Sequence, residues 1–124
     1  MLIVGGTAYE ATMLHGCRAV PVEVAMKGVV GYQDMLVPVS DLGKAVEFGK
    51  NQIGKPYDFA GAFGLPLLMS DDWSDWSKWW CSELTFMQLG AAGNFVLDPA
   101  EKTRITPNDL HQCNFEKTPF VRIK

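Results

Sequence analysis

The chain has 124 residues, 48% of them hydrophobic and 20% charged, which suits one compact domain with a buried core. Its net charge of −3, with lysines and arginines scattered, argues against nucleic-acid binding, because binding phosphates needs clustered cations. No apolar run approaches the ~20 residues of a membrane span, and the apolar start has no basic segment of a secretory signal before it. The length therefore predicts a single domain over residues 1–124. Three cysteines cannot form a complete disulfide framework, so we expect a reducing compartment such as the cytoplasm.

Short apolar or β-branched runs separated by turn residues predict strands. The runs are Met1–Val4, Thr7–Ala11, Arg18–Met26, Asp34–Val39 and Pro119–Ile123. Gly5–Gly6 predicts a tight hairpin turn between the first two, and Pro21 indicates an edge position for the third. In the second run, alternation places Ala8 and Glu10 on one face and Tyr9 on the other.

Two strong helices are predicted after these strands. The first extends over Ser40–Ile53, with the Ser40 hydroxyl as its N-cap. The second, Trp80–Ala92, is apolar on most sides and ends at Gly93, so it is expected to be buried. A shorter helix is predicted over Tyr57–Leu65, and a turn or single helical turn over Pro107–Leu110. The fold class is therefore α+β, with a mostly antiparallel sheet of about five strands packed on the second helix.

Cys81 is the residue whose position most suggests chemistry. It falls in the first turn of the predicted buried helix, where free N–H groups and the helix dipole favour a thiolate. The same N–H groups can stabilise the oxyanion of a tetrahedral intermediate. The alternative is a buried cysteine that serves as a small apolar residue.

Several motifs in order around Cys81 resemble those of a known family. They are Gly54-Lys-Pro-Tyr-Asp-Phe-Ala-Gly61, Trp80-Cys-Ser-Glu-Leu84, Ala92-Gly93 and Ile105-Thr-Pro-Asn-Asp-Leu110. Upstream, Tyr9-Glu-Ala11 followed by Gly16 is similar to that family's glutamate–alanine strand. Together they resemble the permuted papain-like cysteine hydrolases of the NlpC/P60 type, the YiiX-like proteins of bacteria and phages.

This resemblance implies a mechanism and a set of roles. The thiolate of Cys81 attacks a carbonyl carbon and forms an acyl-thioester, a histidine moves the proton, and Glu10 orients the imidazole. Tyr57 would pack near the cysteine helix and assist the oxyanion hole. The implied substrate is an amide in a peptidoglycan peptide or protein, with a lipid acyl ester as an alternative and no cofactor. A phage-encoded domain would be virion-associated.

The family's histidine is the part of the pattern that is not found. It is expected on the strand before Glu10, and no histidine precedes Glu10 here. The two histidines in the chain are His15, in the loop after that strand, and His111; His15 is the better substitute base. We therefore expect a poor hydrolase, or else a catalytically degenerate domain that serves as a binding module.

A metal site is considered because His15-Gly-Cys17 and His111-Gln-Cys113 together supply four possible zinc ligands. Ligands in structural zinc sites are more usually two to four residues apart within a knuckle. No metal is therefore expected.

Four tryptophans precede or adjoin Cys81. Trp79 and Trp80 are expected to wall the substrate cleft, whereas Trp73 and Trp76 lie in an acidic loop over residues 70–79. That loop is a candidate surface for a substrate, a membrane or a protein partner, because tryptophan combines a large area with a polar group. The alternative is a loop folded onto its own domain.

Overall fold

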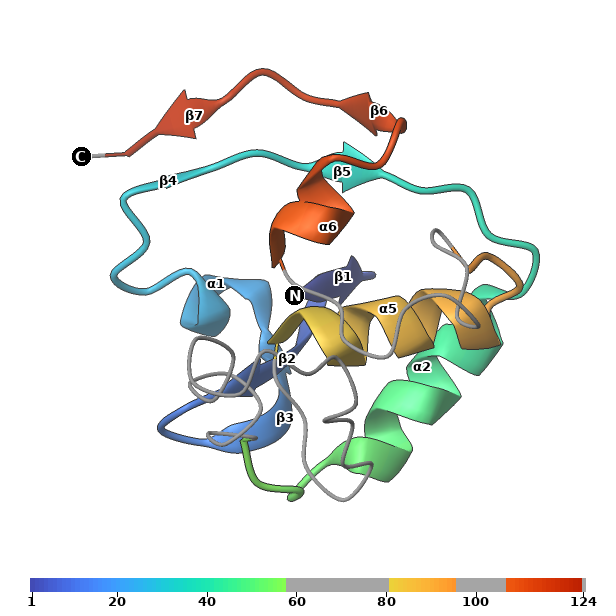
Figure 1. Cartoon of the computed structure of the whole chain (residues 1–124). Coiled ribbons are helices and arrows are strands. Elements are labelled where there is room, and N and C mark those ends of the chain that lie inside the picture. Colours follow the sequence, from blue (N-terminus) through green and yellow to red (C-terminus); the bar gives the residue numbers. More distant parts are fainter. Residues whose placement is uncertain (58–80, 96–106, 124) are drawn as a thin grey trace, which may run out of the picture.

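The computed structural model describes residues 1–57, 81–95 and 107–123, and its elements form an α+β arrangement of antiparallel sheets and four helices in these ranges (Figure 1). The strands are β1 (Leu2–Val4), β2 (Thr7–Thr12), β3 (Gly16–Pro21), β4 (Gly31–Tyr32), β5 (Met35–Leu36), β6 (Glu116–Lys117) and β7 (Val121–Arg122). The helices are α1 (Val22–Ala25), α2 (Leu42–Gln52), α5 (Cys81–Ala91) and α6 (Pro107–His111).

The largest sheet has the order β1-β2-β3, with both pairs antiparallel. Gly5 and Gly6 form the two-residue turn between β1 and β2, with φ angles of 56° and 81°. Positive φ at both positions is what a type I′ hairpin turn requires, so the predicted hairpin is confirmed. β3 is an edge strand and Pro21 is its last residue, as its sequence indicates.

The strand predicted over Arg18–Met26 needs correction. The run Arg18–Met26 is not one strand, because β3 ends at Pro21 and the chain turns into α1. Pro21 pairs with Thr7, the first residue of β2, so beyond it β3 has no partner strand to follow. The Val22 N–H instead donates to the Gly6 carbonyl, 2.9 Å away.

The single sheet of about five strands is also not found within the described ranges. β4 pairs with β7 and β5 pairs with β6, so two separate two-stranded antiparallel sheets accompany the three-stranded one. The predicted strand Asp34–Val39 is reduced to Met35–Leu36, and Pro119–Ile123 to Val121–Arg122. Strand β6 was not anticipated by the sequence pattern.

The N-cap of α2 is Asp41, whose carboxylate accepts a hydrogen bond from the Lys44 N–H, rather than Ser40 as predicted. The Ser40 N–H and hydroxyl both donate to the Ala92 carbonyl, each over 3.0 Å. Ser40 therefore ties the start of α2 to the end of α5, and its side chain is not available for the cap.

Helix α5 ends as predicted. Gly93 has a φ of 97°, and its N–H donates to the Gly90 carbonyl while the Asn94 N–H donates to the Leu89 carbonyl. This pair of bonds is a Schellman motif, which needs a left-handed residue at the position of Gly93.

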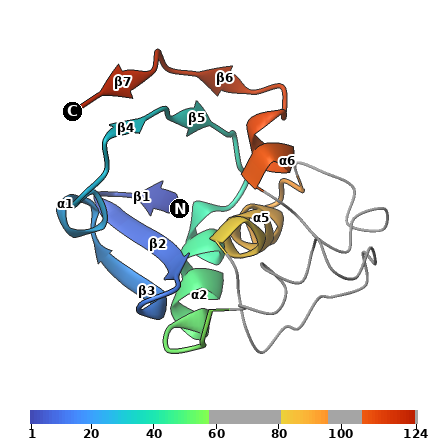
Figure 2. The ribbon, with the colours of Figure 1, turned by 60° about the vertical axis from the view of Figure 1, so that its left-hand side comes forward.

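Helices α2 and α5 lie together on one face of the three-stranded sheet (Figure 2). The core between them contains buried Ala11, Cys17 and Leu84, with Phe48 and Met87 packed against it. No described helix is long and apolar enough to cross a membrane. Of the short helix predicted over Tyr57–Leu65, residues 58–65 lie outside the described ranges.

Candidate functional site

Cys81 is the first residue of α5 and lines a cavity of about 640 Å³. This volume lies within the ~300–1,000 Å³ that is usual for small-molecule sites. The cavity is bordered by β1, by the segment from β4 to the start of α2, and by one side of α5, with Leu110 of α6 at its margin. Its lining comprises Met1, Leu2, Ile3, Val4, Met26, Tyr32, Gln33, Asp34, Met35, Leu36, Val37, Val39, Leu42, Ala45, Cys81, Ser82, Thr85, Leu89 and Leu110.

Helix α5 presents different residues to its two sides. Cys81, Thr85 and Leu89, spaced four apart, share one side and line the cavity. Leu84 and Gln88 point the other way, toward α2 and the sheet, and are fully buried. The Thr85 hydroxyl donates to the Cys81 carbonyl over 3.2 Å, so it is held against the first turn. The thiol therefore lies at one end of a row of residues that face open space.

The other two cysteines are in different surroundings. Cys17 is buried in the core, and burial raises the pKa of its thiol to about 11, against a smaller opposing effect of Lys55. Burial also raises the pKa of the Cys113 thiol, which donates to the Asp109 carbonyl over 3.4 Å. A thiol that stays protonated is a poor nucleophile. Of the three cysteines, only Cys81 is both partly exposed and on the wall of this cavity.

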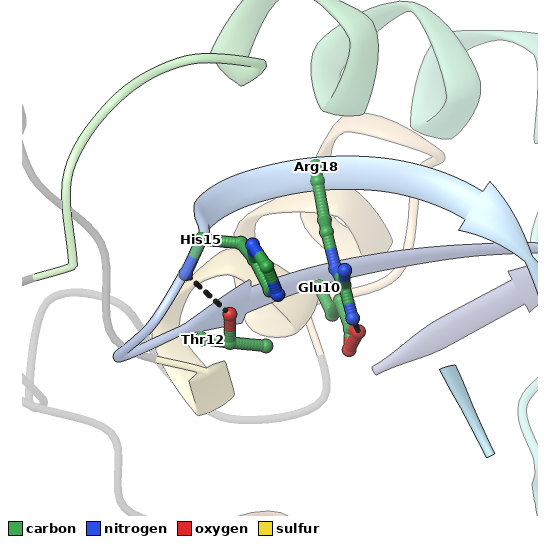
Figure 3. A network of polar contacts seen from close by, with 4 residues as sticks. All are labelled: Glu10, Thr12, His15 and Arg18. Atoms are coloured by element: carbon green, nitrogen blue, oxygen red, sulfur yellow. Dashed lines mark hydrogen bonds and ion pairs between the residues drawn. The ribbon is translucent and has the colours of Figure 1, made fainter. Parts of the chain in front are cut away.

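Glu10 is buried on β2, with 7% of its surface exposed, and its carboxylate forms an ion pair with Arg18 of β3 at 3.0 Å (Figure 3). Glu10 and Arg18 are directly opposite each other in the strand register. Because side chains alternate along a strand, Glu10 lies on the face opposite to Ala11, which packs with Leu84 of α5. The structure therefore does not bring Glu10 onto the described lining of the Cys81 cavity.

Neither histidine lies on that lining. His15 is exposed in the turn between β2 and β3, where its backbone N–H donates to the Thr12 hydroxyl over 3.0 Å (Figure 3). His111 ends α6 and lines a smaller hollow, which shares Gln33, Asp34, Met35 and Leu110 with the Cys81 cavity. Among the described residues, no imidazole therefore lines the Cys81 cavity itself.

Tyr57 packs against the cluster of Ala11, Cys17 and Leu84, so it lies near the cysteine helix as the resemblance implies. Its role in an oxyanion hole stays a prediction. The candidate substrate-binding residues Trp73, Trp76, Trp79 and Trp80 lie outside the described ranges.

Within those ranges, no group of three or more histidine, cysteine, aspartate or glutamate side chains is placed to hold a metal ion. In particular, Cys17 is in the core while the neighbouring His15 is exposed, so this His-x-Cys pair does not converge.

Sequence reasoning missed two parts of the site. The Glu10–Arg18 pair follows from the hairpin register once the β2–β3 turn is placed correctly, so counting along the strands could have found it. The cavity wall over residues 32–37 was predicted only in part, as the strand Asp34–Val39. Its pairing with β6 and β7 had no local signal, because those segments come about 80 to 90 positions later.

Comparisons with known proteins give no match: no family model, curated protein or solved structure is similar to this chain. The resemblance to permuted papain-like hydrolases therefore rests on the motifs alone, and it stays a prediction.

Proposed function

We propose that this domain is a cysteine hydrolase that acts on an amide through an acyl-thioester on Cys81. The observation that supports the proposal most is the placement of the three thiols. Cys81 is partly exposed at the start of α5 and on the wall of a large cavity, whereas Cys17 and Cys113 are buried. The helix start also supplies backbone N–H groups that are suited to an oxyanion.

The reaction has two steps. The Cys81 sulfur bonds to the carbonyl carbon, the C–N bond breaks, and the thiol proton goes to the leaving amine. Water then attacks the thioester, which releases the carboxylic acid and restores the thiol. Both steps need a proton carrier, and the described residues place no histidine at the cavity. We therefore expect slow turnover by this chain and an essential role for any added base.

Mass spectrometry after incubation with p-nitrophenyl acetate tests this function. We expect one acetyl group on Cys81 in the parent chain and none on a Cys81→Ala variant. Turnover above the hydrolysis that imidazole causes without protein should be slow and should rise with added imidazole, because free imidazole can replace an absent base. Equal acetylation of Cys17 or Cys113, or turnover above that no-protein rate that survives Cys81→Ala, would contradict the assignment.

The second candidate function is a binding domain without catalysis. It is favoured by the ion pair of Glu10 with Arg18, since a carboxylate held by a guanidinium is not orienting an imidazole. A lipid acyl ester as substrate is a further alternative. A parent chain that alkylates at Cys81 but never forms an acyl-enzyme, with or without imidazole, would favour the binding domain.

A further inference from the structure

The lining of the Cys81 cavity contains two unbroken runs of sequence. One is Met1–Val4, which includes all of β1, and the other is Tyr32–Val37, which includes β5. Because successive side chains of a strand point to opposite faces, a space bordered by four consecutive residues lies along the strand's edge. The cavity is therefore bounded on one side by the edge of β1 and on the other by the extended segment 32–37, which Figures 1 and 2 show across from it.

The edge of β1 that faces this space has no strand partner among the described residues, since β1 pairs only with β2. A two-residue hairpin loop makes its flanking pair, Val4 and Thr7, a hydrogen-bonded pair. Pairs alternate along an antiparallel ladder, so the N–H and C=O of Ile3 point away from β2. Neither group has a hydrogen bond to any described residue outside the strand.

We propose that an extended polypeptide substrate binds in this cavity as an added strand on the free edge of β1, with Ile3 as its main-chain partner. That the bound peptide is a substrate rests on the proposed function, because Cys81 lines the same space. Binding itself does not require the thiol. An added strand would satisfy the Ile3 N–H and C=O, whereas a lipid acyl chain would leave both unpaired in an apolar site.

The charge of the lining also limits which peptide side chains the cavity favours. Asp34 is the one carboxylate on the described lining, whose side chains include no lysine, arginine or histidine; His111 and Lys117 line the smaller hollow that shares Asp34. The rest is mainly apolar, with Leu2 and Val4 on one wall and Met35 and Val37 on the other. Such a lining favours apolar side chains, and on the Cys81 side of Asp34 it favours a basic residue over an acidic one.

The test uses the full chain carrying Cys81→Ala, so that binding is measured without acylation. The probe is a blocked hexapeptide of valines and threonines with one lysine, and its partner carries glutamate in place of lysine. We expect the lysine peptide to bind more tightly and to slow hydrogen exchange at the Ile3 amide. Replacing Ile3 with proline (Ile3→Pro) removes the outward N–H and should weaken binding by about three- to tenfold, the scale of one backbone hydrogen bond.

Ile3→Val is the matched control, because it keeps the amide and a β-branched side chain and should bind like the parent. Circular dichroism checks that Ile3→Pro is folded. If it is unfolded, hydrogen exchange at the Ile3 amide of the chain that keeps Ile3, with and without peptide, decides whether the peptide binds at this edge. Unchanged exchange at Ile3, or tighter binding of decanamide than of the peptide, would overturn the proposal. A concentration-dependent dimer that Ile3→Pro abolishes would overturn it too, because a second copy would then occupy the edge. Peptide binding by the Cys81→Ala chain, together with no acylation of the parent chain by p-nitrophenyl acetate, would contradict only the proposed function.

Discussion

The two sides of helix α5 have different surroundings. Toward α2 and β2, Leu84 and Gln88 are enclosed by close contacts, and α2 approaches so closely that a side chain on Gly49 would overlap the Gln88 amide and the Tyr9 ring. Toward β1, Cys81 and Thr85 border a cavity of about 640 Å³. One helix thus holds the core on one side and displays a thiol on the other, so stability and chemistry can be altered separately.

The largest expected contrast is between two neighbouring residues of α5. Leu84→Ala should lower the free energy of unfolding by about 2–5 kcal/mol, because it leaves a hole in the core. Thr85→Ala should change it by less than about 1 kcal/mol, because Thr85 borders open space and alanine favours helix. Urea unfolding of both variants measures the contrast. Equal losses would show that the cavity side is packed as tightly as the core.

Local signals explain which parts of the fold could be predicted. The β1–β2 turn, the end of α5 at Gly93 and the single helical turn at Pro107–His111 each depend on a few adjacent residues, and each was found from sequence. The pairing of β5 with β6 depends on contacts between distant segments, which periodicity does not report. The predicted Ser40 cap was wrong for a similar reason, because Ala92 competes for that hydroxyl from the end of another helix.

The candidate site also has one part that local sequence predicts and one part that it does not. The position of Cys81 at the start of an apolar helix follows from local pattern, and the structure places it there. The partner of Glu10 follows only once the turn between β2 and β3 is placed correctly, because it depends on the exact register of the two strands. The resemblance implies that Glu10 orients an imidazole beside the thiol; its carboxylate instead pairs with Arg18, on the face of the sheet opposite to Ala11 and α5.

The cysteines provide the second contrast, since Cys17 lies on the core side and Cys81 on the cavity side. With a pKa of about 11, roughly one Cys17 thiol in a thousand is ionised at pH 8, and burial restricts access further. We expect iodoacetamide to modify Cys81 at least about 100-fold faster than Cys17 at that pH, as followed by mass spectrometry of peptides. The Cys17 rate should rise about tenfold per pH unit as pH approaches 11.

Cys113 serves as the control for this measurement, because its thiol is also buried and its pKa is also raised. It should therefore react slowly, like Cys17. If Cys81 reacted no faster than these two in the folded chain, the cavity would not admit even a small reagent. Unfolding in urea should bring the three rates close together, since burial is then lost.

A third contrast compares two glycines of α2. Gly49→Ala should destabilise the domain by about 1–3 kcal/mol, because the added methyl group meets Gln88 and Tyr9 in a core without room for it. Gly43→Ala, in the first turn of the same helix, gains up to about 1 kcal/mol of helix propensity, but its methyl group would lie 3.3 Å from the Asp41 oxygen that caps the helix. Its net effect should therefore be smaller than that of Gly49→Ala. Thermal unfolding of the two variants separates the effect of the added methyl group's contacts from the effect of helix propensity. A stabilising Gly49→Ala would show that α2 and α5 can move apart at little cost.

The smallest expected effect concerns a polar side chain in the core. Gln88 is fully buried; its Nε2 donates to the Ala45 carbonyl over 3.2 Å, while its Oε1 has no hydrogen-bond partner among the described residues. Gln88→Met keeps the length of the side chain, loses one hydrogen bond and removes one unpaired acceptor. These two terms are similar in size and opposite in sign, so the free energy of unfolding should change by less than about 1 kcal/mol. Gln88→Ala, which leaves a cavity, should cost more than Gln88→Met. In urea unfolding, a loss above about 1.5 kcal/mol for Gln88→Met would mean that Oε1 accepts a hydrogen bond in solution, in addition to the one that Nε2 donates to Ala45.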